Sequence, residues 1–323
     1  MSEPDWAFPS ELRPRPEEWG FDLERALGAM VLLRVEVPED AFTAQILGTE
    51  RLGNGVVIRD DGLILTIGYL ITEASAVWIT TAQGAVLAGH ALAYDQQTGL
   101  GLVLPLGRLG VPPLALGSAS RAQAGDDILV AGHGGRAHAL KGQLFDKREF
   151  AGYWEYVLDE ALFATPAHPQ WGGSGLIDAD GKLIGIGSLL VEEKHGDKQV
   201  QGNMFVPVEL LEPILEDLVK RGRAQRPARP WLGMYTTEMG NKLVVAGLAA
   251  GGPADRAGLQ LGDIIVGVAG EPPRSLAELF RSVWRLGPAG VEVPLTISRA
   301  GTRLQMRLAS IDRNDFLKKP QLH

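Results

Sequence analysis

One stretch in the C-terminal third decides much of the fold, and it reads GPADRAGLQLGDII at residues 252–265. It lies among short apolar runs that turn residues separate, a pattern typical of strands. Strands are predicted near Leu232–Tyr235, Leu243–Val245, Ile264–Val268, Val293–Ser298 and Leu304–Leu308. One main helix is predicted from Ser275 to Leu286, because Ser275 and Glu278 can form a capping box at its start. The stretch therefore belongs to a small, mostly β unit.

A Pro- and Arg-rich segment at residues 223–230 precedes this unit. Ahead of it, apolar residues recur at helical spacing from 210 to 218, and Gly222 is typical of a helix end. We interpret residues 223–230 as a solvated linker and as the clearest domain boundary of the chain. The unit behind it spans residues 231–312, and a polar tail at 313–323 follows.

Residues 26–222 contain two sets of short apolar runs, from Val31 to Leu116 and from Asp127 to Val206. An Asp-Gly step between two apolar runs, at Asp61-Gly62, is a strong hairpin signal. Two β sets of similar length predict two packed barrels. The 41 glycines and 20 prolines of the chain also favour a mostly β architecture with many tight turns.

Composition and charge disfavour several classes of protein. The chain has 323 residues, 45% of them hydrophobic and 22% charged, as expected of an ordinary soluble protein with two or three compact units. Its formal net charge of -8 disfavours nucleic acid as a partner. It has no cysteine, hence no disulfide framework and no cysteine metal site. No His, Asp or Glu pair has convincing ligand spacing, so we expect no cofactor and no metal.

The N-terminal sequence, Met-Ser-Glu-Pro-Asp-Trp, has none of the features of a secretory signal. The apolar stretch Ala29–Leu33 is too short to cross a membrane. Taken as written, the sequence predicts a cytoplasmic protein without a membrane span.

Residues 231–312 resemble a bacterial PDZ domain of the HtrA family. The match rests on residues 252–265 and on Trp231-Leu232-Gly233-Met234, which corresponds to the family's carboxylate-binding loop and the strand after it. The resemblance implies capture of a peptide or protein C-terminus, which needs backbone N–H donors, a free strand edge and an apolar slot. Leu279 and Val283, one helical turn apart, would form the wall of the slot opposite Leu232 and Met234. The alternative is that these four apolar residues belong only to the core.

Residues 26–222 resemble the chymotrypsin-type double barrel of the same family. The match is carried by Gly53–Ile58, Asp95–Leu104 and Gly172–Ile186, among other segments. Only an N-terminal arm, residues 1–25, and the C-terminal tail lie outside the resemblance. It implies a mostly β fold class, a chymotrypsin-like double β-barrel followed by a C-terminal PDZ domain.

The resemblance also places the catalytic triad, and all three positions hold other residues. Tyr69 stands where the family has histidine, Gly99 where it has aspartate and Gly172 where it has serine. A phenol, with an ordinary pKa near ~10, is a poor base near neutral pH. Since hydrolysis needs all three roles, we expect an inactive protease homologue, a pseudoprotease.

The alternative is an active serine endopeptidase with a rebuilt site around Ser174. His168 is the best candidate base, although a base and a nucleophile so close along an extended strand usually point apart. Gln170 stands where the family has an oxyanion-hole glycine, which also argues against activity.

The leading hypothesis is a scaffold or regulator that binds a partner through the PDZ domain, and an active protease paralogue is one such partner. The N-terminal aromatic residues Trp6, Phe8, Trp19 and Phe21 would serve a homotrimer, by resemblance to the family, or fold back onto their own barrel. A third hypothesis is a purely structural subunit with neither a groove nor an active site.

Overall fold

The computed structural model describes residues 6–195 and 198–318, and the side chains of 193–198 are left out of the description. The described chain divides into two compact units. The first comprises residues up to 148 together with 160–224, and the second comprises 149–159 together with 225–318. Residues 149–159, which the sequence analysis places in the double-barrel range, therefore pack within the second unit.

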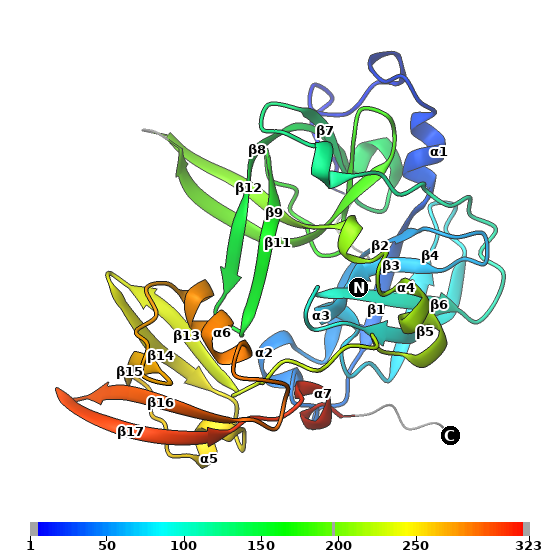
Figure 1. Ribbon diagram of the computed structural model, residues 1–323. Coiled ribbons are helices and arrows are strands. Elements are labelled where there is room, and N and C mark those ends of the chain that lie inside the picture. The colour runs from blue at the N-terminus through cyan, green and yellow to red at the C-terminus, as the bar shows by residue number, and fades with distance from the viewer. Residues whose placement is uncertain (1–5, 196–197, 319–323) are drawn as a thin grey trace. The chain divides into compact units, whose positions relative to one another are not determined.

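The first unit contains two closed six-stranded barrels (Figure 1). The first barrel has the strand order β1-β2-β3-β6-β5-β4. Its strands are β1 (Met30–Glu36), β2 (Glu50–Val57), β3 (Ile64–Ile67), β4 (Ala76–Thr80), β5 (Val86–Tyr94) and β6 (Leu100–Pro105). All residues of β3 are buried, which fits a strand that passes between β2 and β6 inside a closed barrel.

The second barrel has the order β10-β11-β12-β9-β8-β7. Its strands are β7 (Asp127–Ala131), β8 (Ala139–Gly152), β9 (Tyr156–Thr165), β10 (Gly175–Ile177), β11 (Leu183–His195) and β12 (Lys198–Pro207). Its buried cluster includes Ile128, Leu162, Leu176 and Phe205. Phe8 of the N-terminal arm belongs to the same cluster.

Short helices connect and flank the barrels of the first unit. The α-helices are α1 (Leu23–Gly28), α2 (Ala44–Leu47), α3 (Gly68–Ile71) and α4 (Leu215–Arg221), and the 3-10 turns are η1 (Pro16–Glu18), η2 (Ala119–Arg121), η3 (Gly135–His138) and η4 (Val208–Leu210). The helix predicted across 210–218 starts later, at Leu215, because Pro213 lacks the N–H that a continuous helix needs. Its predicted end is confirmed, since Gly222 caps α4 with a φ of 72°.

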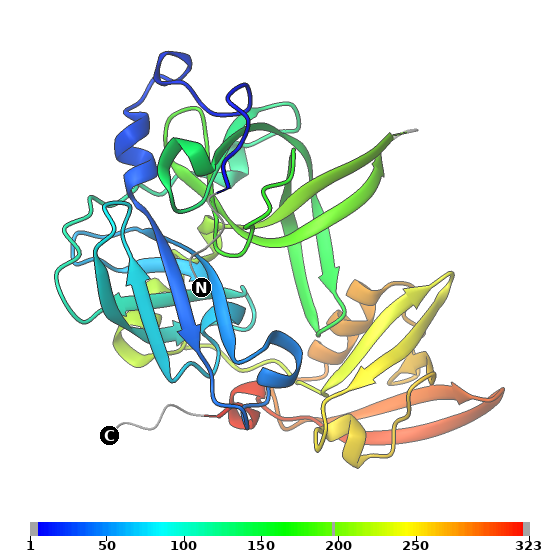
Figure 2. The same ribbon diagram turned by 180° about the vertical axis from the view of Figure 1, so that it is seen from behind.

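The second unit has a five-stranded sheet in the order β13-β14-β15-β16-β17, drawn from yellow to red in Figure 2. Its strands are β13 (Met234–Met239), β14 (Lys242–Leu248), β15 (Ile264–Val268), β16 (Glu292–Arg299) and β17 (Thr302–Ala309), and its helices are α5 (Pro253–Arg256), α6 (Leu276–Trp284) and α7 (Arg313–Phe316).

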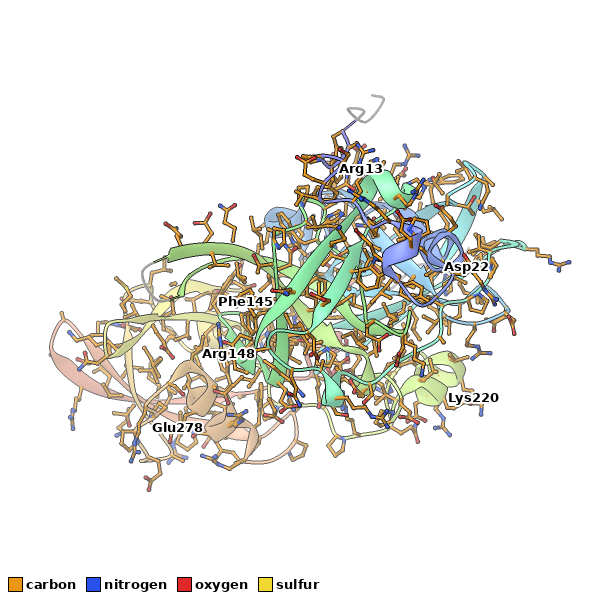
Figure 3. The ribbon with its side chains drawn as sticks, turned by 90° about the horizontal axis from the view of Figure 1, so that it is seen from above. Arg13, Asp22, Phe145, Arg148, Lys220 and Glu278 are labelled. Carbon is orange, nitrogen blue, oxygen red and sulfur yellow. The ribbon has the colours of Figure 1, made fainter. Side chains whose placement is uncertain are left out.

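The predicted start of the main helix is confirmed. Ser275 is the N-cap of α6 and accepts a hydrogen bond from the N–H of Glu278, in the first turn. Figure 3 shows Glu278 on this helix. The Glu278 carboxylate binds the N–H of Arg274, one residue earlier than in a standard capping box.

Candidate functional site

The structure brings the three predicted triad positions together in the first unit. Gly68 and Tyr69 begin α3 directly after β3, and the N–H of Gly68 donates to the carbonyl of Gly99 at 2.7 Å. Gly99 lies in a turn with a φ of 78°, where a residue with a side chain is strained. A Cβ atom on Gly172 would lie 2.9 Å from the hydroxyl oxygen of Tyr69. Residues 69, 99 and 172 therefore lie close together, and their role as triad positions stays a prediction.

Tyr69 is fixed by hydrogen bonds at both its side chain and its backbone. Its hydroxyl donates to the carbonyl of Ser188 at 3.0 Å, and its own carbonyl accepts from the guanidinium of Arg51 at 2.7 Å. Burial raises the pKa of Tyr69 above its ordinary value. The Tyr69 phenol therefore loses its proton less readily than that of a free tyrosine, so it is less able to supply a phenolate base near neutral pH.

The loop at residues 170–174 is held against β2 by Asn54. The N–H of Asn54 donates to the carbonyl of Gly172 at 2.8 Å, and its side-chain amide donates to the carbonyl of Gln170 at 2.9 Å. Gly173 has a φ of 75°, and a Cβ atom there would lie 1.9 Å from the Asn54 carbonyl oxygen. This close approach of two backbones requires glycine at position 173.

Ser174, the alternative nucleophile, is fully buried. Its hydroxyl donates to the carbonyl of Trp171 at 2.8 Å. A nucleophilic serine has to donate its proton to a base, whereas this proton is directed at a backbone oxygen.

His168, the alternative base, is also fully buried, and both of its ring nitrogens have partners. Nδ1 accepts from the N–H of Gln170 at 3.1 Å, so Nε2 carries the proton and donates to the carbonyl of His138 at 3.0 Å. Burial lowers the pKa of His168 to about 4. The structure therefore does not pair His168 with Ser174.

A cavity of about 360 Å³ lies beside the predicted triad positions. Tyr69, Gln170, Trp171 and Gly172 contribute to its wall, together with Arg51. At two of the three predicted triad positions this lining contains a phenol and a glycine.

The residues predicted for the peptide groove lie in the second unit. Leu232, Met234, Leu279 and Val283 are all buried in one apolar cluster. Trp231 is buried too, and its ring centroid lies 5.0 Å from that of Phe316. The burial of the four aliphatic residues agrees with the alternative that they belong to the domain core. Their part in a peptide groove stays a prediction.

The predicted carboxylate-binding loop has a partner that the sequence analysis missed. The N–H groups of Leu232, Gly233 and Met234 all donate to the carboxylate of Glu155. Burial raises the pKa of Glu155 to about 7, although the three N–H donors and Arg313 act to lower it. No sequence signal points to Glu155, because it stands alone between aromatic residues in a hairpin.

The N-terminal arm packs on its own barrel through Trp6 and Phe8. Trp6 contacts the rings of Phe8 and His138 at centroid distances of 5.1 and 4.5 Å, and Trp19 contacts Phe21 at 5.7 Å. This is the alternative considered for the arm, and a homotrimer stays a prediction.

Among the described residues, no group of three or more His, Cys, Asp or Glu side chains could hold a metal ion. Within the same residues, no helix is long and apolar enough to span a membrane.

Comparison with known proteins identifies both parts of the chain. Residues 53–186 match the model of the trypsin-like peptidase domain, and residues 244–299 match that of the PDZ domain. This chain joins a trypsin-like peptidase domain to a PDZ domain. The predicted fold class is thereby confirmed.

The curated relatives of this chain include proteins named as serine endoproteases. A probable periplasmic serine endoprotease, DegP-like, of Ectopseudomonas mendocina is 24% identical over 277 residues, which are 80% of this chain and 56% of that protein. The serine endoprotease DegS of Haemophilus influenzae is 24% identical over 80% of this chain and 77% of its own. The chain thus spans about half the length of the DegP-like relatives it matches.

The fold is also that of a solved HtrA structure. The HtrA-type protease AlgW, solved with a decapeptide, superposes with a TM-score of 0.54 at 19% identity and covers 93% of this chain and 98% of its own. At this identity the likeness shows the fold alone.

Proposed function

We propose that this chain is a pseudoprotease whose double barrel does not hydrolyse peptide bonds and whose PDZ domain captures the C-terminus of a peptide or protein. The partner class follows from the loop at Leu232–Met234, where three consecutive N–H groups converge on one carboxylate. A C-terminal carboxylate is the ligand that such a loop recognises. An active protease of similar fold is one partner of this class.

The observation that carries the inactive reading is the contact between positions 69 and 172. In a working site the base lies within hydrogen-bond reach of the nucleophile. Here the group next to position 172 is the Tyr69 hydroxyl, and its proton is donated to the carbonyl of Ser188. Gly172 offers no hydroxyl in return, and Gly99 offers no carboxylate to orient a base.

The names of the relatives favour the alternative, a serine endopeptidase that acts through Ser174. Its difficulty is geometric. Ser174 donates to Trp171, and His168 is occupied at both nitrogens, so activity would require both side chains to leave their present partners.

Incubation with unfolded casein tests the proposal. The chain is compared with Ser174→Ala and with an active HtrA-type protease, at high enzyme concentration and long times, and each is also treated with a fluorophosphonate that labels reactive serines. We expect neither cleavage nor labelling of the chain or of the variant. Cleavage and labelling that disappear in Ser174→Ala would refute the proposal and establish the endopeptidase.

A further inference from the structure

The tip of the β8–β9 hairpin, residues 149–159, belongs to the second unit. The two strands lie side by side in both ribbon views (Figures 1 and 2). At the tip, the carboxylate of Glu155 accepts the N–H of Gly233 at 2.7 Å, of Leu232 at 3.0 Å and of Met234 at 3.1 Å. A ring of N–H donors around one carboxylate is the arrangement by which such a loop binds a peptide terminus.

The tip also supplies the two other features of a bound peptide, a backbone contact with a strand and an apolar side chain. The carbonyl of Tyr153 accepts the N–H of Thr236 on β13 at 3.1 Å, which is a strand-type backbone contact. Val157 is 6% exposed and belongs to the buried cluster that contains Met234, Leu279 and Val283. Carboxylate, backbone pairing and apolar side chain thus come from one five-residue segment of the same chain.

Burial and backbone conformation both indicate that the contact between Glu155 and the Leu232–Met234 loop is a specific part of the fold. Glu155 is itself only 6% exposed. Its φ of 62° is unfavourable for a residue with a side chain, so the surrounding contacts must hold it there. Hydrogen bonds from N–H groups to an ionised carboxylate are among the stronger ones in proteins, and the three donors here each favour the ionised form of Glu155. At the flanks of the tip, Arg281 of α6 pairs with Glu149 and Asp159.

We propose that Glu155 is an internal ligand of the PDZ carboxylate site and that a peptide C-terminus binds only by displacing the hairpin tip. This inference rests on the proposed function, because it takes peptide capture as the task of the loop. The apparent affinity for a peptide is then reduced by the fraction of molecules in which the tip occupies the site. The fitting ligand has a free terminal carboxylate and a small apolar last side chain, as Val157 has.

The test compares Glu155→Ala and the conservative Glu155→Gln with Glu160→Gln in the full chain. Glu160 is the matched control, because it lies on the same hairpin and its side chain is 65% exposed beside Lys147. Hydrogen exchange of the amides at residues 232–234 is measured first. We expect about tenfold or faster exchange in Glu155→Ala, a smaller change in Glu155→Gln and none in Glu160→Gln.

Each variant is then titrated with an octapeptide that ends in Tyr-Val, with a free carboxylate or with a terminal amide. We expect the free-carboxylate peptide to bind Glu155→Ala about tenfold or more tightly than the unaltered chain, and the amide to bind neither. Equal affinity for both chains, or unchanged amide exchange, would overturn the internal ligand. Faster exchange without any peptide binding would instead refute peptide capture and the displacement step, while Glu155 would still be the group that holds the loop.

Discussion

Tyr69 and Gly172 are the two residues whose contact carries the inactive reading, and a double-mutant cycle tests it. A Cβ atom at position 172 would lie 2.9 Å from a Tyr69 hydroxyl that Ser188 holds in place. Gly172→Ala should therefore destabilise the chain, and it should do so less in Tyr69→Phe, which lacks the hydroxyl. We expect a coupling energy of about 1 kcal/mol from urea denaturation of the four proteins.

Gly28→Ala provides the control for this cycle. A Cβ atom at position 28 would meet nothing within 4 Å, so its effect should add to that of Tyr69→Phe. If the effects of Gly172→Ala and Tyr69→Phe on the unfolding free energy also simply added, positions 69 and 172 would not face each other. The triad alignment would then be wrong.

His168 is a second residue with a testable property, the pH dependence of stability. Its pKa is lowered to about 4, so the folded chain favours the neutral ring. The stability that this provides is complete above the ordinary pKa near ~6.5 and is lost as the pH falls towards 4. Between pH 7 and 4.5 the unaltered chain should lose about 2 kcal/mol more unfolding free energy than His168→Gln.

Urea denaturation at the two pH values gives this difference. His90 is exposed, so His90→Gln should keep the pH dependence of the unaltered chain. A His168→Gln protein with that same dependence would show that His168 is not held neutral in the fold.

At the scale of elements, the sequence predicts those parts whose signals are local. The N-cap Ser275 and the C-cap Gly222 each depend on a few neighbouring residues, and both are found where the pattern predicts them. Residues 69, 99 and 172 each stand in a segment that resembles the family, and they lie close together in the structure. Their role as triad positions stays a prediction.

The hairpin tip could not be predicted in this way. Glu155 and its donors are 77 to 79 residues apart in the chain, and no periodicity or motif links them. The strands β8 and β9 follow an ordinary strand pattern, which says nothing of the unit in which their far end packs. Only the tertiary structure brings the Glu155 carboxylate to the N–H groups of Leu232, Gly233 and Met234.

At the scale of the whole molecule, the absence of cysteine makes release of the tip measurable. Val157→Cys would place the only thiol of the chain at a site that is 6% exposed while the tip is docked. Its rate of reaction with a thiol reagent should therefore report how often the tip leaves the second unit. We expect reaction at least about tenfold slower than at Leu261→Cys, a position that is 69% exposed in the same unit.

The same rate distinguishes displacement from binding elsewhere. A peptide with a free C-terminal carboxylate should speed the reaction of Val157→Cys and leave Leu261→Cys unchanged, because it competes with Glu155 for the N–H groups of Leu232–Met234. Adding Glu155→Ala should speed it without peptide, since the tip then lacks its carboxylate. A Val157→Cys thiol that stays slow in the Glu155→Ala background would show that the apolar contacts alone hold the tip, and that Glu155 is not the group a peptide must displace.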